Sequence, residues 1–115
     1  MTEFKVVPVP KPRMTRRDIW AKRPCVLRYY VYKDKVRLQT KKSKFKLSDS
    51  FKIVFTLPTT VTKRWNKPHQ LRPDLDNLIK AFCDAMMKED KTIYKIEASK
   101  IWGKEGKIVV INCEL

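Results

Sequence analysis

Residues 72–88 carry the sequence RPDLDNLIKAFCDAMMK, and this stretch decides how the second half of the chain folds. Its apolar residues recur every three or four positions, which predicts a helix with one buried face. We expect the helix to begin near Asp74 or Leu75, because Pro73 precedes it and aspartate is a good N-terminal cap. Two carboxylates, those of Asp74 and Asp76, therefore stand at the start of an amphipathic helix.

These two aspartates have two interpretations. One can cap the helix while the other complements the positive end of the helix dipole, which accounts for both without any function. Alternatively, they hold a divalent metal ion, because metal-assisted cleavage of a phosphodiester needs two or three carboxylates and open positions for water. A further acidic pair, Glu89-Asp90, follows the helix. The spacing leaves both interpretations open.

Two more charged residues lie on the same predicted helix. Lys80 comes four residues after Asp76, so it either forms an ion pair there or stabilises charge on a phosphate. Asp84 comes eight residues after Asp76, a rise of about 12 Å, which is too far to share a metal ion. We expect Asp84 to pair with Lys80 or Lys88.

The length of this helix decides where Asp90 lies. An unbroken helix over residues 75–88 would span about 20 Å and leave Asp90 at the far end from Asp74. We expect the helix to end early and the chain to double back. Delivery of Asp90 by a dimer partner is the alternative.

The remaining elements follow from hydrophobic periodicity and from turn residues. Residues 4–9 predict a short strand that ends in a proline-rich segment, residues 26–39 a helix, and residues 51–57 a strand with one buried face. Residues 94–102 and 107–113 predict two strands, which we expect to form a hairpin around the intervening loop. The element order is β-α-β-α-β-β. We expect one α+β domain over residues 1–115, with a small mixed sheet and two main helices.

The charge of the chain is concentrated in its first two-thirds. The net charge is +15, of which residues 1–73 carry +16 and residues 74–115 carry −1. A nucleic acid is the partner that this charge favours, and an anionic membrane surface is the weaker alternative. The candidate phosphate contacts lie in two basic loops: Arg13, Arg16 and Arg17 in the first, and Lys63, Arg64 and Arg72 in the second.

Other features exclude several classes of protein. The apolar runs are far shorter than a membrane span, and no secretory signal is visible. The three cysteines are widely spaced, which is typical of reduced thiols in a cytosolic protein. We therefore expect a cytoplasmic protein.

The motif Pro-Asp-x-Asp-Asn-x-x-Lys over residues 73–80, followed by residues 84–86, Glu89-Asp90 and Ile93, resembles the signature of RusA-type Holliday junction resolvases. The segments at residues 11–13, 69–70 and 100–102 are similar to phage-type members of that family. Glu89 departs from the pattern, since family members often have Asp-Asp at that position.

The resemblance implies a homodimer that nicks four-way DNA junctions symmetrically in DNA recombination and repair. It also implies that Asp74, Asp76 and Asp90 are essential carboxylates that hold Mg²⁺, with Mn²⁺ as a substitute, and that Lys80 is the catalytic lysine. The expected setting is the cytoplasm of a bacterial or phage-infected cell. Two alternatives remain: a non-catalytic basic nucleic-acid-binding module, and a metal nuclease that acts on other branched or flapped DNA.

Overall fold

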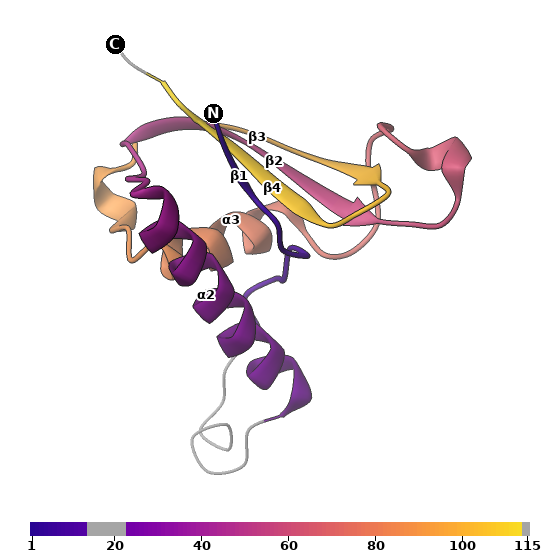
Figure 1. The fold of residues 1–115 in the computed structure, drawn as a ribbon, viewed down its shortest axis with the longest axis horizontal. Coiled ribbons are helices and arrows are strands. Elements are labelled where there is room, and N and C mark those ends of the chain that lie inside the picture. Colours follow the sequence, from indigo (N-terminus) through magenta and orange to yellow (C-terminus); the bar gives the residue numbers. More distant parts are fainter. Residues whose placement is uncertain (14–22, 114–115) are drawn as a thin grey trace.

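The computed structural model describes residues 1–13 and 23–113, and it combines a four-stranded mixed sheet with two main helices (Figure 1). The elements are β1 (Thr2–Phe4), α2 (Pro24–Ser43), β2 (Ser50–Pro58), α3 (Leu75–Ala85), β3 (Lys95–Gly103) and β4 (Lys107–Asn112), with short 3-10 turns at Thr62–Arg64 and Asp90–Thr92. The predicted α+β class and the order β-α-β-α-β-β are confirmed. Two predicted DNA contacts, Arg16 and Arg17, lie outside the described residues.

The strand order of the sheet is β1-β4-β2-β3, so the predicted hairpin between the last two strands is wrong. β3 pairs parallel with β2 on one side, and β4 pairs antiparallel with β2 on the other. The loop at residues 104–106 carries the chain past the end of β2. This short loop suffices, because two strand spacings measure about 10 Å and four residues reach about 14 Å.

Both glycines of the chain lie at this crossing. A Cβ atom at Gly103 would collide with the side chain of Thr56 on β2, and one at Gly106 would lie 2.6 Å from the Cα atom of Val7. At this crossing the backbone passes so close to neighbouring residues that only glycine fits at these two positions. The same two glycines that suggested a hairpin turn instead allow the loop to pass over a third strand.

The two helices lie on the same side of the sheet (Figure 1). β2 turns one face toward the helices, and its residues Phe51, Ile53, Phe55 and Leu57 are buried beneath them. α3 contributes Phe82 to this core, where its ring meets that of Phe4 on β1 edge to face, with 5.5 Å between the centroids. In the described part of the chain, neither helix is long and apolar enough to cross a lipid bilayer.

Two element boundaries differ from the prediction. β1 ends at Phe4 rather than continuing to residue 9, because the amide of Lys5 donates to the side chain of Gln39 and the amide of Val6 donates to the carbonyl of Phe4. α2 is longer than predicted at both ends. Pro24 is tolerated in its first turn, and Lys44 ends it in a left-handed conformation, with its amide bonded to the carbonyl of Thr40.

Candidate active site

The first turn of α3 presents two carboxylates to solvent. Asp74 occupies the N-cap position as predicted, but its side chain makes no capping hydrogen bond. Asp76 lies in the first turn, and its carboxylate is 3.8 Å from the ammonium of Lys80. Both side chains of this pair are more than half exposed, so the pair contributes little to stability. Capping therefore does not account for the side chain of Asp74, and the ion pair leaves Lys80 available to other anions.

One face of α3 lines a hollow of about 310 Å³ that brings together three of the predicted catalytic residues. Asp76, Lys80 and Asp90 supply its charge, and Cys83 lines it from the same helix. Its remaining wall is apolar and consists of Ile79, Ile93 and Ile96. Burial, with the negative charge of Asp90 nearby, raises the pKa of the Cys83 thiol to about 11, so this thiol stays neutral. Asp74 does not line the hollow.

A sharp turn after α3 returns Asp90 to this hollow. The amide of Met87 donates to the carbonyl of Asp84, and the amide of Lys88 donates to that of Cys83. Met87 has a left-handed backbone, with φ at 56°. These two bonds and the left-handed residue make a Schellman motif, which reverses the chain at the end of a helix. The helix therefore ends early and the chain doubles back, as predicted.

Asp84 is paired, but with a partner that the sequence did not indicate. Its Oδ2 atom lies 2.7 Å from Nζ of Lys11 and accepts a 2.7 Å hydrogen bond from the hydroxyl of Tyr29. The predicted partners are engaged elsewhere: Lys80 faces Asp76, and Lys88 pairs with Asp49. Burial opposes ionisation of Asp84, but the bonds from Lys11 and Tyr29 outweigh it and lower the pKa of its carboxyl.

The segment that carries Lys11 borders a second, larger hollow of about 620 Å³. Residues 11–13 form one side of it, and its other lining residues are Asn77, Lys80, Asp84 and Asp90. Lys80 and Asp90 thus line both hollows. The N-terminal basic segment therefore lies beside the candidate catalytic residues, although it is more than 60 residues away in sequence.

The loop that leads into α3 is held by a lysine that the sequence did not identify as structural. The ammonium of Lys100 on β3 donates to the carbonyl of Leu71, and to that of Pro73 at 2.7 Å. His69 is buried beside them, with its ring 4.0 Å from that of Trp102. Burial and the nearby charge of Lys100 lower the pKa of His69. These contacts hold the loop before Asp74 in place. They could not be predicted from the sequence, because they depend on how the folded chain packs.

The predicted DNA contacts within the described residues are solvent-exposed. Lys63 and Arg64 lie in the first 3-10 turn, beyond the end of the sheet, and Arg72 directly precedes the proline before α3. The guanidinium of Arg64 lies 5.4 Å from the ring centroid of Trp102. Arg13 lines the larger hollow beside α3. All four basic side chains are therefore accessible to a polyanion without a change in the fold.

The donor set at the smaller hollow suits a hard divalent cation. Mg²⁺ binds through one or two carboxylates and keeps several water molecules, and Asp76 and Asp90 supply two carboxylates to one solvent-open hollow. Over residues 1–13 and 23–113, no three histidine, cysteine or acidic side chains stand close enough to form a complete metal cluster. The third predicted ligand, Asp74, stands outside the hollow at the same end of the helix as Asp76.

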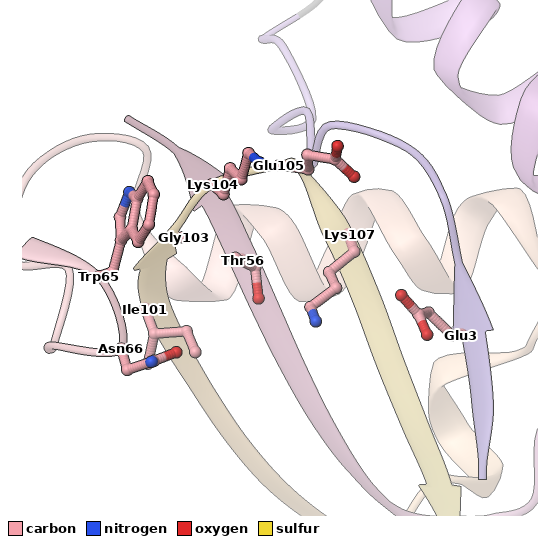
Figure 2. Close-up of a pocket in the computed structure, with 9 residues that line it drawn as sticks. All are labelled: Glu3, Thr56, Trp65, Asn66, Ile101, Gly103, Lys104, Glu105 and Lys107. Atoms are coloured by element: carbon pink, nitrogen blue, oxygen red, sulfur yellow. The ribbon is translucent and has the colours of Figure 1, made fainter. Parts of the chain in front are cut away.

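A groove of about 430 Å³ lies on the opposite face of the sheet (Figure 2). Figure 2 shows Lys107 of β4 and Glu3 of β1 on this face, with a helix visible behind the sheet. Trp65 stands at its edge, and the indole donates a 3.0 Å hydrogen bond to the carbonyl of Thr59. None of the predicted catalytic carboxylates lines this groove, so it is separate from the candidate active site.

The comparisons with known proteins identify one family. The sequence model of the family described as Endodeoxyribonuclease RusA matches residues 3–111. No individual curated protein matches the chain. The matched range includes both hollows beside α3 and all of the candidate site residues.

Proposed function

Because the chain belongs to the RusA endodeoxyribonuclease family, we propose that it is a metal-dependent endonuclease that cuts four-way DNA junctions at two symmetric positions. The observation that supports this most directly is the hollow on α3. It places Asp76, Lys80 and Asp90 together on a solvent-open surface beside a basic segment. The proposed setting is recombination and repair of DNA in the cytoplasm of a bacterial or phage-infected cell.

The catalytic roles follow from the chemistry of each side chain. Asp76, Asp90 and Asp74 hold Mg²⁺, or Mn²⁺ in its place. When bound, the metal ion would polarise the phosphodiester and lower the pKa of a water molecule. Lys80 turns from its weak pair with Asp76 toward the phosphate and stabilises the negative charge that develops there.

The basic residues grip the DNA backbone rather than its bases. Arg13 and Arg72 flank α3, and Lys63 and Arg64 extend the cationic surface beyond the end of the sheet. The predicted contacts Arg16 and Arg17 belong to the same basic segment as Arg13. Contacts to phosphates fix the position of a protein on DNA without reading its sequence. Such contacts suit an enzyme that recognises the shape of a junction.

The proposed enzyme is a homodimer, because a four-way junction offers two equivalent phosphates and one chain carries one candidate site. The core side of β4 is not available to a partner, because Ile108 and Val110 are fully buried. The uncovered face of the sheet is a better candidate. By register, it presents Val54, Val109 and Ile111, and its charged members are Glu3, Lys52, Lys95, Glu97 and Lys107.

The charge of this face favours a second copy as its partner. Three lysines and two glutamates leave a net charge of only +1 on it, whereas the whole chain carries +15. Two copies related by a two-fold axis can therefore bring it together without the repulsion that other surfaces would cause, and lysines of one copy can meet glutamates of the other.

The experiment that tests the proposed function uses a labelled synthetic four-way junction. We expect two symmetric nicks with Mg²⁺, none with EDTA, and much slower cutting of a linear duplex at the same salt concentration. Binding of the junction without metal-dependent scission would instead support a non-catalytic DNA-binding module. Faster cutting of a flapped substrate than of the junction would support a nuclease for other branched DNA.

A further inference from the structure

The carboxylate of Asp84 joins three segments that are distant in the sequence. It belongs to α3, it accepts a hydrogen bond from Tyr29 of α2, and it pairs with Lys11 of the N-terminal segment at 2.7 Å. The backbone amide of Lys11 also donates to the carbonyl of Asn77, at 3.2 Å. The N-terminal segment is thus attached to α3 at two points, one through its backbone and one through a charged side chain.

The attachment through Asp84 is the stronger of the two. A hydrogen bond between ionised groups is shorter and about twice as strong as a neutral one. The side chain of Asp84 is 36% exposed, so water screens the pair only in part. The lowered pKa of its carboxyl agrees with an ionised Asp84 at neutral pH. The backbone bond alone would leave the segment free to pivot about Asn77.

The attached segment borders the larger of the two hollows beside α3. Lys80 and Asp90 line both the smaller hollow and the larger one, so the two hollows adjoin. Arg13 lines the larger hollow together with Lys80 and Asp90. The ammonium of Lys11 is already neutralised by Asp84. The guanidinium of Arg13 is therefore the cation of this segment that remains available to a phosphate.

We propose that Asp84 is a positioning residue, which holds residues 11–13 against α3 so that Arg13 binds the backbone phosphate next to the one that is cut. This inference rests on the proposed nuclease function. It assigns to Asp84 a role in binding substrate. Asp84 cannot share a metal ion with Asp76, because the two residues are too far apart along the helix. It also gives the larger hollow a ligand, a phosphate of the DNA backbone.

The test compares Asp84→Asn with the matched control Asp34→Asn. Asp34 lies on α2 with its side chain exposed, and its substitution makes the same change in charge. We expect Asp84→Asn to raise KM for the junction, and to weaken junction binding in EDTA, by about fivefold, the size of one lost phosphate contact. We expect kcat to stay within about twofold, and Asp34→Asn to match wild type.

A double-mutant cycle with Arg13→Ala separates positioning from a general structural role. If Asp84 acts by placing Arg13, each single variant should weaken binding about fivefold, and the double variant should be no weaker than either. The amide of Lys11 should also exchange with solvent faster in Asp84→Asn, while the amides of α3 keep their protection. Additive losses, or an unchanged KM in Asp84→Asn, would overturn the proposal.

Two controls keep the result interpretable. Should Asp84→Asn melt at a temperature much below wild type, Lys11→Met removes the other end of the pair at an exposed position and must give the same loss and the same non-additivity with Arg13→Ala. The binding measurement in EDTA needs no catalysis. Failure of the proposed function would appear as a wild-type protein that does not cut, whereas failure of this inference would appear as unchanged affinity in the variants.

Discussion

Individual carboxylates of this protein differ in what they contact, and the contacts assign them different roles. Asp74 and Asp76 are exposed at the start of α3, and Asp90 lines the same hollow as Asp76 and Lys80. Asp84, on the same helix, is instead joined to two other segments. Residue type and spacing singled out Asp76 and Asp90, which line one hollow, and Asp74, which stands outside it. They could not predict the partner of Asp84, because a chain with 27 basic residues offers too many candidates.

We expect Asp76→Asn and Asp90→Asn each to abolish cleavage of a four-way junction while leaving junction binding intact. Asparagine keeps the shape of the side chain but removes the charge that a divalent cation requires. Because Asp76 and Asp90 line the solvent-open hollow, loss of their negative charge removes a repulsion of phosphate there. The measurement is cleavage with Mg²⁺ beside a gel-shift titration in EDTA. Asp74→Asn should behave in the same way, and near wild-type cleavage by any two of the three variants would contradict the assignment.

His69 gives the fold a dependence on pH with a defined sign. Burial and Lys100 lower its pKa in the folded state, so as the pH falls below about 6.5 the unfolded chain takes up a proton that the folded chain resists. The free energy of unfolding should therefore decrease between pH 7.5 and pH 5.5. His69 is the only histidine, so the effect should be smaller in His69→Asn. Urea unfolding at both pH values measures it, and an equal decrease in the two proteins would contradict the assignment.

At the scale of elements, the end of α3 determines whether Asp90 can join the site. The helix stops at Ala85 because Met87 adopts a left-handed conformation that closes a Schellman motif. The sequence showed an apolar stripe that continued through Met86. It gave no signal for this turn, since the residue in the left-handed position is a methionine rather than the usual glycine.

We expect Met87→Gly to stabilise the protein by about 1 kcal/mol, because glycine adopts this backbone conformation without the steric cost that a side chain carries. The side chain of Met87 is 78% exposed, so its removal sacrifices little packing. Met86→Gly is the matched control and should destabilise, since Met86 has a right-handed helical backbone and packs on the core. Chemical unfolding of the three proteins decides the matter. A loss of stability in Met87→Gly would show that its side chain matters more than its backbone.

At the scale of the whole molecule, the sheet leaves one face uncovered. Its strand order also shows where prediction from sequence stopped. Hydrophobic periodicity identified β2 with its buried face, and it identified β3 and β4 as strands, because each strand reports its own environment. The pairing between strands depends on which segment occupies the middle of the sheet. β2 holds that position, and the short loop before β4 is compatible with both a hairpin and a crossing.

We expect sedimentation at micromolar concentration to show about twice the 13.7 kDa mass of the chain, and Val109→Glu to reduce it to one chain. Glutamate at this position places an unpaired charge at the centre of the uncovered sheet face. Leu38→Glu, on a side chain that is 56% exposed on α2, is the control and should remain dimeric. A wild-type monomer that stays monomeric on a junction it cuts twice would contradict the dimer, and dissociation of both variants would contradict the face.

The pairing of β1 with β4 joins two strands that are more than 100 residues apart in the sequence. Thr2 lies opposite Val110, and the central strand β2 gains both of its neighbours only from residues beyond 94. A nascent chain therefore cannot complete its sheet while the C-terminal strand is still unmade. The aspartates of α3 emerge from the ribosome well before the scaffold that places them. For a protein proposed to cut DNA, this order of synthesis means that a chain that stops before β4 would carry its candidate catalytic residues on an incomplete sheet.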